Sequence, residues 1–254
     1  MTKVTLNLIA TNGYTVYLND IIESAKKHFM RDTDLSFIIY TNSINISESD
    51  RIKVINIENE PWPAPTLKRF HYFCKAWDII EKSDFSFYID VDSSFRKSFD
   101  FSHLESILSK DEIRMVGTLH PGYYGKKGTP ERRADSTAYI SEAMNNRYFC
   151  GGFFGGKSSD FLNISRRLRD NIDIDLENGI IAIWHDESHI NNYFLNYPPS
   201  IVLGEGFSCP EESFPSNGRE EQLGRYRFTD PTILFLDKGG KKDELRGIIQ
   251  KDND

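Results

Sequence analysis

Hydrophobic and polar positions in the first sixty residues alternate between short apolar runs and one stretch with helical spacing. The run KVTLNLIAT at 3–11 predicts a buried strand, and the NGY after it predicts a turn. Apolar residues recur at helical spacing over 17–30, and two more apolar runs at 34–42 and 51–57 predict strands. The order strand, helix, strand, strand is typical of the start of a parallel sheet.

The next forty residues continue this alternation. A proline-broken segment, ENEPWPAPT, precedes a predicted helix at 67–82, and an alternating apolar strand then ends at Asp90. We therefore expect a doubly wound half-domain that binds its ligands at the carboxyl ends of its strands.

The second half of the chain is less regular. A strand in 113–125 ends in a Gly/Pro turn, and 126–140 predicts a long mobile loop. Residues 148–180 predict a glycine-rich strand pair followed by a long helix, and a further strand is expected to end at Trp184. The last residues lose apolar periodicity and predict a flexible tail.

Composition fits one elaborated domain of a soluble protein. The 254 residues are 39% hydrophobic and 27% charged, and 13% are aromatic, which suits base or sugar stacking as well as core packing. The net charge of −7 argues against a chain that follows phosphate backbones, so nucleic acid is not an expected partner.

The cysteines and the first residues indicate a compartment. Cys74, Cys150 and Cys209 are widely spaced, which fits neither a disulfide framework nor a zinc knuckle and suits a reducing environment. The start is too short and too polar for a signal peptide, and no window is apolar enough to span a membrane. A soluble, cytoplasmic protein without a transmembrane segment is expected.

Asp90 and Asp92 are the first candidate for chemistry. Side chains along a strand alternate, so both point to the same side of its end. Two like charges there are stable only with a cation, and a divalent metal that also binds phosphate oxygens is the economical choice. The alternative is a solvated strand end whose acids pair with Arg96 and Lys97.

Two other DxD chemistries fit less well. A calcium loop counted from Asp90 needs Gly and Glu where Phe95 and Phe101 stand. A haloacid-dehalogenase-like phosphatase also opens with a strand and DxD, but it needs a further acidic pair, and the chain has no Asp-Asp dipeptide.

WHDESH at 184–189 is the second candidate. His185 and His189 are four residues apart, like the ligands of a zincin, but a zincin needs Glu directly after the first His and this chain has Asp186. Zinc is therefore not favoured. The segment remains either a functional group of carboxylates at a helix start or a simple helix cap by Asp186.

Together these segments resemble glycosyltransferase family 6, which includes the blood-group A and B transferases and α1,3-galactosyltransferase. YIDVD, GTLHPGYYG, ERRADSTAYI, GGFFGG and WHDESHINNYFL share the family's order and spacing over residues 3–236. The resemblance implies an α/β GT-A fold with a mixed central sheet in one catalytic domain, 1–236. Residues 1–100 would form the Rossmann-like UDP-sugar-binding half and 101–236 the acceptor half, and the tail 237–254 would close over UDP.

The resemblance also implies a reaction. Gal or GalNAc would pass from a UDP-sugar to the 3-hydroxyl of a β-galactoside, with retention of anomeric configuration. Asp90 and Asp92 would hold Mn²⁺, or Mg²⁺ in its place, against the diphosphate. Many bacterial relatives carry NxN and work without metal, and this chain departs from them, so metal dependence is expected.

Residue roles follow by position. Ala10 and Tyr14 would lie at uracil, Val91 at the ribose, Arg69 at the donor sugar and diphosphate, and His185 and Asp186 at the donor sugar. The resemblance also implies that the donor is contacted by Asp90, Asp92, Gly151, Gly152, Lys238 and Arg246. In the tail, Lys241 or Lys242 can take the place of Lys238 or Arg246 as a phosphate contact.

The acceptor side is implied in the same way. Trp184 would stack under the acceptor galactose, His120 and Thr129 would bond its hydroxyls, and Tyr123 would flank it. Glu187 would lie at the anomeric carbon as the catalytic carboxylate and border the acceptor. It is either a nucleophile or a stabiliser of an oxocarbenium-like state, and the sequence leaves both open.

Gly151 and Gly152 bear on donor choice, because small residues at the matching positions leave room for an acetamido group. UDP-GalNAc is thus favoured over UDP-Gal, although the glycines also suit a permissive backbone turn. Two rival functions stay open: a non-catalytic glycan- or sugar-nucleotide-binding protein and a metal-dependent phosphohydrolase.

Overall fold

The computed structural model describes residues 1–123, 128–141, 147–211 and 230–247. Four stretches fall outside these ranges: residues 124–127 in the predicted turn and loop, residues 142–146 and 212–229 of the expected domain 1–236, and residues 248–254 of the predicted tail.

Seven strands of the described residues form the central sheet, in the order β3-β2-β1-β4-β7-β6-β8. Strands β1 to β4 pair in parallel, whereas β7 runs antiparallel to both β4 and β6, so the sheet is mixed. The strands are β1 (Lys3–Ile9), β2 (Asp34–Thr41), β3 (Ile52–Asn56), β4 (Phe85–Ile89), β6 (Met115–Leu119), β7 (Phe149–Lys157) and β8 (Ile201–Leu203). The predicted α/β fold with a mixed central sheet is confirmed.

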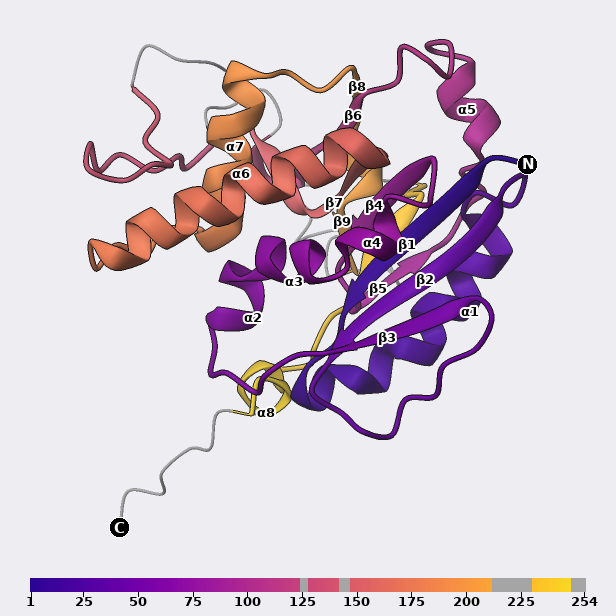
Figure 1. Cartoon of the computed structure of the whole chain (residues 1–254), viewed down its shortest axis with the longest axis horizontal. Coiled ribbons are helices and arrows are strands. Elements are labelled where there is room, and N and C mark those ends of the chain that lie inside the picture. The colour runs from indigo at the N-terminus through magenta and orange to yellow at the C-terminus, as the bar shows by residue number, and fades with distance from the viewer. Residues whose placement is uncertain (124–127, 142–146, 212–229, 248–254) are drawn as a thin grey trace, which may run out of the picture.

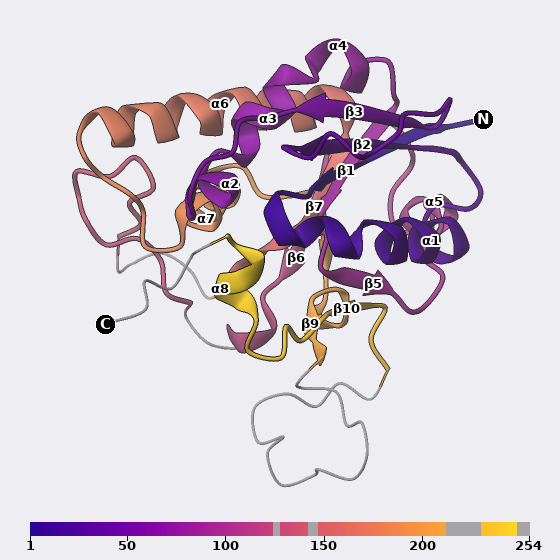
Figure 2. The ribbon, with the colours of Figure 1, turned by 90° about the horizontal axis from the view of Figure 1, so that it is seen from below.

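Helices cover both faces of this sheet (Figures 1 and 2). One face packs against α3 (Arg69–Lys75), α4 (Trp77–Ile80), α6 (Ser158–Glu177) and α7 (His185–Asn196), with α2 (Ala64–Leu67) beside α7. The other face packs against α1 (Leu18–His28), α5 (Phe101–Glu105) and a smaller sheet of β5 (Ser93–Phe95), β10 (Ile233–Phe235) and β9 (Cys209–Pro210). The core is therefore two apolar layers, one on each side of the sheet.

The site lies where the carboxyl ends of β1 and β4 meet. Directly after β1 the chain forms a 3₁₀ helix, η1 (Asn12–Tyr17), and the short C-terminal helix α8 (Lys242–Leu245) packs against it (Figure 2). The contact is close, because a Cβ on Gly13 would lie 2.9 Å from the Cα atom of Leu245. The segment that follows β1 and the last described helix thus meet at one end of the sheet.

The single helix predicted at 67–82 is wrong, because the structure has α2, α3 and α4 in its place. The backbone leaves helical geometry at Lys68 and Ala76, whose ψ angles are 16° and 18°. These two breaks let Phe70 and Phe73 pack into the core while Arg69 turns into the functional site.

The glycine-rich strand pair predicted after residue 148 is also wrong, because β7 is one strand of nine residues. Its glycines serve close packing, not a turn. A Cβ on Gly155 would lie 2.3 Å from Cδ1 of Phe87 on β4, and a Cβ on Gly156 would lie 2.0 Å from the carbonyl oxygen of Arg114. Glycine is required where β7 inserts between β4 and β6.

The strand predicted to end at Trp184 does not form. The alternation that predicted it is real, since Ile181 and Ile183 are exposed while Ile180 and Ala182 are buried. The backbone groups of this segment bond to side chains instead of to a neighbouring strand, and α7 begins directly at His185.

Candidate functional site

A cavity opens at the carboxyl ends of β1 and β4, between η1, the start of α3 and the C-terminal segment. Most of the predicted donor-side residues meet there. Its lining comprises Ile9, Thr11, Asn12, Tyr14, Trp62, Pro65, Thr66, Arg69, Tyr88, Asp90, Val91, Asp92, Lys238, Lys242 and Arg246. The lining lacks five of the predicted donor-side residues: Ala10, Gly151, Gly152, His185 and Asp186. The side chain of Ala10 is buried in the core beside the cavity.

Asp90 and Asp92 both line this cavity, and each has a cationic partner. Asp90 lies 3.2 Å from a guanidinium nitrogen of Arg69, and the ammonium of Lys238 donates to Asp92. The alternative pairing with Arg96 and Lys97 is wrong, since Lys97 pairs with Asp230. The two acids belong to the cavity and not to a solvated strand end.

The electrostatics of this pair favour a cation. Burial, and secondly the neighbouring Asp90 charge, raise the pKa of the Asp92 carboxyl, while Lys238 acts in the opposite direction. Burial also opposes the charge of Lys238, but the neighbouring Asp92 raises the pKa of its ammonium. Asp92 is thus a buried carboxylate that depends on positive charge close by.

Arg69 connects the parts of the site. It is 5% exposed and donates to the carbonyl oxygen of Gly151, and its Nη1 lies 2.8 Å from Oδ2 of Asp186. Its guanidinium stacks 4.1 Å above the ring of Tyr88, whose hydroxyl donates to Asp90 over 2.6 Å. One buried guanidinium therefore holds β4, β7 and the start of α7 together.

Asp186 and Glu187 stand in the first turn of α7, where the helix dipole favours negative charge. Burial raises the pKa of each carboxyl to about 7. Arg69 opposes this shift for Asp186, and the backbone N–H of Gly151, which donates to Glu187 over 2.8 Å, opposes it for Glu187. His185, the residue before them, has a positive φ of 50°, which is unusual for a residue other than glycine. The helix starts at this residue.

Gly151 and Gly152 line the gap between the two carboxylate groups. A Cβ on Gly151 would lie 3.3 Å from Cβ of Glu187, and a Cβ on Gly152 would lie 2.5 Å from the ring of Phe235 and 2.9 Å from Asp90. Glycine at both positions keeps β7 tight against the site. Gly152 packs directly against Phe235 and Asp90, which leaves no room for a side chain at this position.

The predicted acceptor-side residues also come together. Thr129 is the centre, because the indole N–H of Trp184 donates to its hydroxyl and the Tyr123 hydroxyl lies 3.0 Å away. The rings of His120 and Tyr123 are 4.9 Å apart. Trp184 is 46% exposed, so its ring remains open to a ligand.

His120 is held in one neutral form. Burial lowers the pKa of its imidazole to about 4, and its Nδ1 accepts a hydrogen bond from the backbone N–H of Gly122 over 3.0 Å. A neutral imidazole that accepts at Nδ1 carries its proton on Nε2. His120 thus offers one N–H donor to a hydroxyl.

Tyr148 and Trp62 are two of the site residues that the sequence did not predict, and Tyr88 under Arg69 is another. Tyr148 lies at the junction of the two sides: its ring is 5.0 Å from that of Tyr123, and burial and the Glu187 charge raise the pKa of its hydroxyl. Trp62 lies between the ring of His185 at 4.9 Å and the guanidinium of Arg246 at 4.1 Å. A tryptophan between prolines in ENEPWPAPT was the one available signal.

The structure also bears on the two histidines of WHDESH. His185 faces Trp62, whereas His189 is buried beside Asp175 on α6. The two imidazoles therefore have different neighbours and different environments, which does not support the zinc interpretation.

The residues present fit a hard divalent cation held together with a phosphate ligand. The described residues contain no group of three or more His, Cys, Asp or Glu side chains around one point. Asp90 and Asp92 would supply two oxygen ligands, and water and phosphate oxygens would supply the rest, as is common for such cations.

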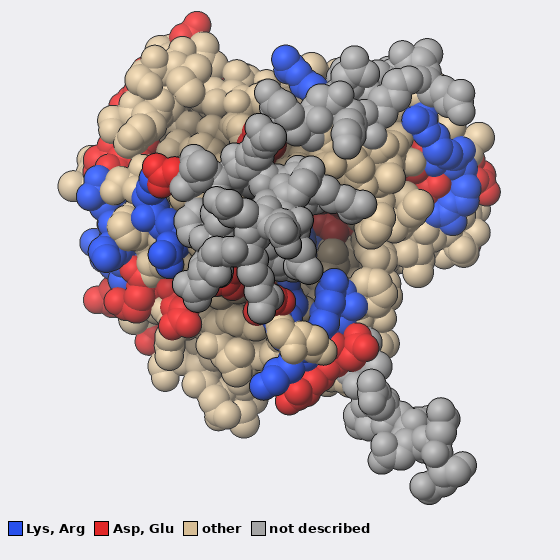
Figure 3. All heavy atoms as spheres, turned by 180° about the vertical axis from the view of Figure 1, so that it is seen from behind, with Lys and Arg blue, Asp and Glu red and all other residues tan. Residues whose placement is uncertain are grey.

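Charged side chains elsewhere are mixed in sign. On the face drawn in Figure 3, Lys and Arg lie next to Asp and Glu in several places, and wide areas between them are uncharged. In the described part of the chain no helix is both long and apolar enough to cross a membrane.

Comparison with known proteins identifies the family. The model of glycosyltransferase family 6 matches residues 1–223. The chain is 29% identical over 209 residues to the O-antigen biosynthesis glycosyltransferase WbnI of Escherichia coli, covering 80% of this chain and 86% of that protein. It is 29% identical to histo-blood group ABO system transferase 2 of Rattus norvegicus, covering 83% of this chain and 64% of that protein.

A third relative is globoside alpha-1,3-N-acetylgalactosaminyltransferase 1 of Homo sapiens, which is 28% identical over 210 residues, 78% of this chain and 58% of that protein. The chain thus spans most of the bacterial relative and about three fifths of the mammalian ones. The family match covers the whole central sheet and ends before Lys238, Lys242 and Arg246 of the cavity. The chain belongs to glycosyltransferase family 6 and is a glycosyltransferase of GT-A-like fold.

Proposed function

We propose that this protein is a retaining, metal-dependent α1,3-glycosyltransferase that moves GalNAc from UDP to the 3-hydroxyl of a β-galactoside. One observation carries the proposal: Arg69 joins the carboxylate pair at the diphosphate position to the carboxylates of α7 in a single site. Relatives named as alpha-1,3-N-acetylgalactosaminyltransferases support the linkage and the sugar.

The donor would bind along the cavity with uracil at Tyr14 and ribose at Val91. Ala10, which is buried, would contribute only the backbone of that wall. Lys238 and Arg246 would contact the diphosphate, and closure of the segment from residue 237 onward over UDP would exclude water from the transfer. That closure matters because a transferase must not hydrolyse its donor.

A divalent cation, Mn²⁺ or Mg²⁺, held by Asp90 and Asp92 would neutralise charge on the UDP leaving group. Arg69 and Asp186 would orient the donor sugar, with His185 beside it. Because Arg69 already bonds Asp186 and the carbonyl of Gly151, the donor sugar meets a site whose polar groups are fixed before it arrives.

Glu187 is the proposed catalytic carboxylate. It is held by the N–H of Gly151 and lies between the cavity and the acceptor cluster. In a two-step route its oxygen bonds the anomeric carbon as the bond to UDP breaks, and the acceptor oxygen then displaces Glu187 while the acceptor proton passes to the UDP phosphate. In a one-step route it stabilises the oxocarbenium-like state while the acceptor proton passes to the departing phosphate.

The acceptor galactose would stack on Trp184 and bond Thr129 and His120, with Tyr123 at its side. All four are uncharged, as suits a neutral sugar. The preference for GalNAc rests on the small residues Gly151 and Gly152, although Phe235 and Asp90 lie directly against Gly152.

A transfer screen tests the proposal. UDP-[³H]GalNAc, UDP-[³H]Gal and UDP-[³H]GlcNAc are each incubated with lactose, N-acetyllactosamine and fucosylated galactosides, with Mn²⁺ or with EDTA, and NMR of the product gives linkage and configuration. We expect an α1,3-linked GalNAc product that needs metal. Binding without turnover would favour the glycan-binding alternative, and phosphate release without an acceptor would favour the phosphohydrolase.

A further inference from the structure

The segment that carries Thr129 is partly buried although it has no regular secondary structure. Its described residues, 128–141, form no helix or strand, yet Glu131, Ser136 and Ala138 are buried. With no backbone ladder to a neighbouring element, the position of the segment depends on its side-chain contacts. Those contacts converge on two buried carboxylates, Glu131 and Asp175.

Glu131 fixes the segment next to Trp184. One carboxylate oxygen accepts from the backbone N–H groups of Arg132 and Arg133, and the other accepts from the backbone N–H of Ile183 over 2.8 Å. The Arg133 guanidinium bonds both oxygens. These donors, with Arg133 first, lower the pKa of the Glu131 carboxyl to about 2, so it is an ionised acceptor at neutral pH. Glu131 lies two residues after Thr129 and is hydrogen-bonded to Ile183, the residue just before Trp184. It thus fixes Thr129 close to Trp184.

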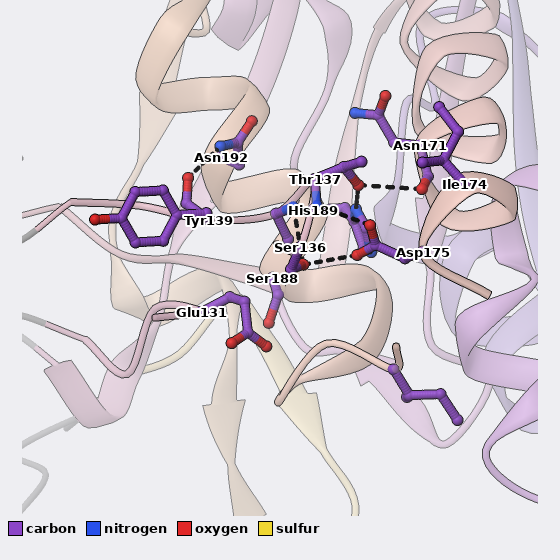
Figure 4. A network of polar contacts seen from close by, with 12 residues as sticks. Glu131, Ser136, Thr137, Tyr139, Asn171, Ile174, Asp175, Ser188, His189 and Asn192 are labelled. Carbon is purple, nitrogen blue, oxygen red and sulfur yellow. Dashed lines mark hydrogen bonds and ion pairs between the residues drawn. The ribbon is translucent and has the colours of Figure 1, made fainter. Parts of the chain in front are cut away.

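Asp175 fixes the other end of the segment to α6 (Figure 4). It is 2% exposed and accepts from the hydroxyl of Ser136 over 2.6 Å and from the backbone N–H of Thr137 over 2.7 Å. The Thr137 hydroxyl also reaches the carbonyl of Asn171 on α6. His189 of α7 lies on the other side, and burial lowers its pKa to about 4, so it is neutral.

These contacts link the acceptor residues to the catalytic helix. His189 stands on α7 between the carboxylates at its start and Asn192, which donates to the carbonyl of Tyr139 (Figure 4). Further along the chain, the hydrogen bond from Ile140 to the carbonyl of Glu131 closes the segment on itself. The distance from Thr129 to the first turn of α7 is therefore set by Glu131 and Asp175, neither of which lines the donor cavity.

We propose that Glu131 and Asp175 are positioning residues of the acceptor site, which hold the segment 128–140 against α6 and α7 so that Thr129 stays on Trp184. The proposal rests on the function proposed above. It follows that loss of either carboxylate weakens recognition of the acceptor and spares that of the donor.

Steady-state kinetics with Glu131→Gln and Asp175→Asn test this. Both changes keep the size of the side chain and remove its charge, and the lost charge-assisted hydrogen bonds should raise the acceptor KM by about tenfold. The affinity for UDP and metal, measured by calorimetry, should stay within about twofold, as should slow donor hydrolysis without acceptor, since neither residue touches the donor cavity.

Asp173→Asn is the matched control. Asp173 is also on α6 and also pairs with a histidine, His71, over 2.7 Å, but on the side away from the segment. We expect it to leave the acceptor KM unchanged. Amide hydrogen exchange of the segment 128–140 should rise in Glu131→Gln and Asp175→Asn and not in this control.

A folded variant with wild-type acceptor KM overturns the proposal, as does a parallel loss of acceptor and UDP affinity. If Glu131→Gln or Asp175→Asn does not fold, Ser136→Ala removes one hydrogen bond to Asp175, and several-fold higher acceptor KM is then the expected result and an unchanged KM the contrary one. The wild-type protein separates the two proposals: absence of transfer to any acceptor refutes the function itself, whereas normal transfer by the variants refutes only the positioning role.

Discussion

On the donor side of the site the predicted ligand-binding residues are joined by ion pairs, whereas on the acceptor side they are joined by hydrogen bonds between uncharged side chains. Arg69 pairs with Asp90 and Asp186, and Lys238 pairs with Asp92. On the acceptor side, the corresponding contacts join Thr129 to Tyr123 and Trp184.

The difference matches the chemistry of the two proposed ligands. A diphosphate and its cation bring charge, so the donor side needs charged partners that can be exchanged when the ligand arrives. A galactoside is neutral, so the acceptor side needs fixed donors, acceptors and an aromatic face. Changes on the two sides should therefore affect different measured quantities.

The largest expected effect is that of Glu187→Gln, which removes the proposed catalytic carboxylate and keeps its shape. Transfer should fall by roughly a thousandfold or more, as for the loss of an essential catalytic group. UDP affinity should change little, because Glu187 does not line the donor cavity. Quenched-flow measurement of product gives the rate, and transfer at the wild-type rate would show that Glu187 is not the catalytic residue.

The same variant should gain stability in a pH-dependent way. Burial raises the folded-state pKa of Glu187 to about 7, so the folded protein favours the protonated form. The stabilisation is complete below the unfolded pKa and is lost as pH rises through 7, where the wild type carries a buried charge. Glu187→Gln should thus be more stable than wild type by about 3 kcal/mol at pH 8 and equal to it near pH 4. Urea unfolding at both pH values checks this.

The second effect concerns the carboxylate pair. Asp90→Asn and Asp92→Asn should each lower metal-dependent transfer by about a hundredfold, because each removes a proposed ligand. Mn²⁺ binding measured by electron paramagnetic resonance with UDP present should weaken in parallel. Asp230→Asn, which removes the partner of Lys97 away from the cavity, is the control. Full activity in EDTA would exclude a metal.

Lys238→Met should have a smaller effect, and it should lower the affinity for UDP while raising the affinity for Mn²⁺. UDP affinity should fall by about tenfold, because one phosphate contact is lost. Mn²⁺ affinity without nucleotide should rise, because Asp92 no longer has the ammonium as its partner. Lys242→Met removes a neighbouring lysine that does not pair with Asp92 and should leave Mn²⁺ affinity unchanged. Equal Mn²⁺ affinity in Lys238→Met would mean that the ion pair does not oppose the metal.

Thr129→Val should have the smallest effect and should act on the acceptor alone. It removes the hydroxyl that receives the Trp184 N–H, so the acceptor KM should rise by about fivefold to tenfold. UDP affinity should not change. A loss of UDP affinity of the same size would contradict the separation of the two sides.

Sequence predicted the local parts of this molecule best. The strands of the first half, and the two acids that follow the last of them, depend on a period-two pattern and on residues close in the chain. Tyr123, Thr129 and Trp184 were expected at one site from the family resemblance, and the structure brings them together.

What sequence did not predict depends on distant partners. No local pattern shows that Arg69 pairs with Asp186. Nor does one show that the backbone N–H of Ile183 donates to Glu131 and not to a neighbouring strand. The glycines of β7 were interpreted as a turn. Their true cause is crowding by Phe87, which lies on β4, distant in the chain from the glycine that it crowds. Tyr148 was missed for the same reason, since its neighbours belong to other segments.

Arg69 has a further consequence in terms of linked equilibria. Its one guanidinium pairs with both Asp90 and Asp186. A cation that pairs with Asp90 in place of Arg69 would therefore let Arg69 bind Asp186 more strongly. Thermodynamic linkage requires this effect to be reciprocal. If metal and donor bind as proposed, the factor by which metal tightens binding of the donor's sugar would equal the factor by which that sugar tightens binding of metal.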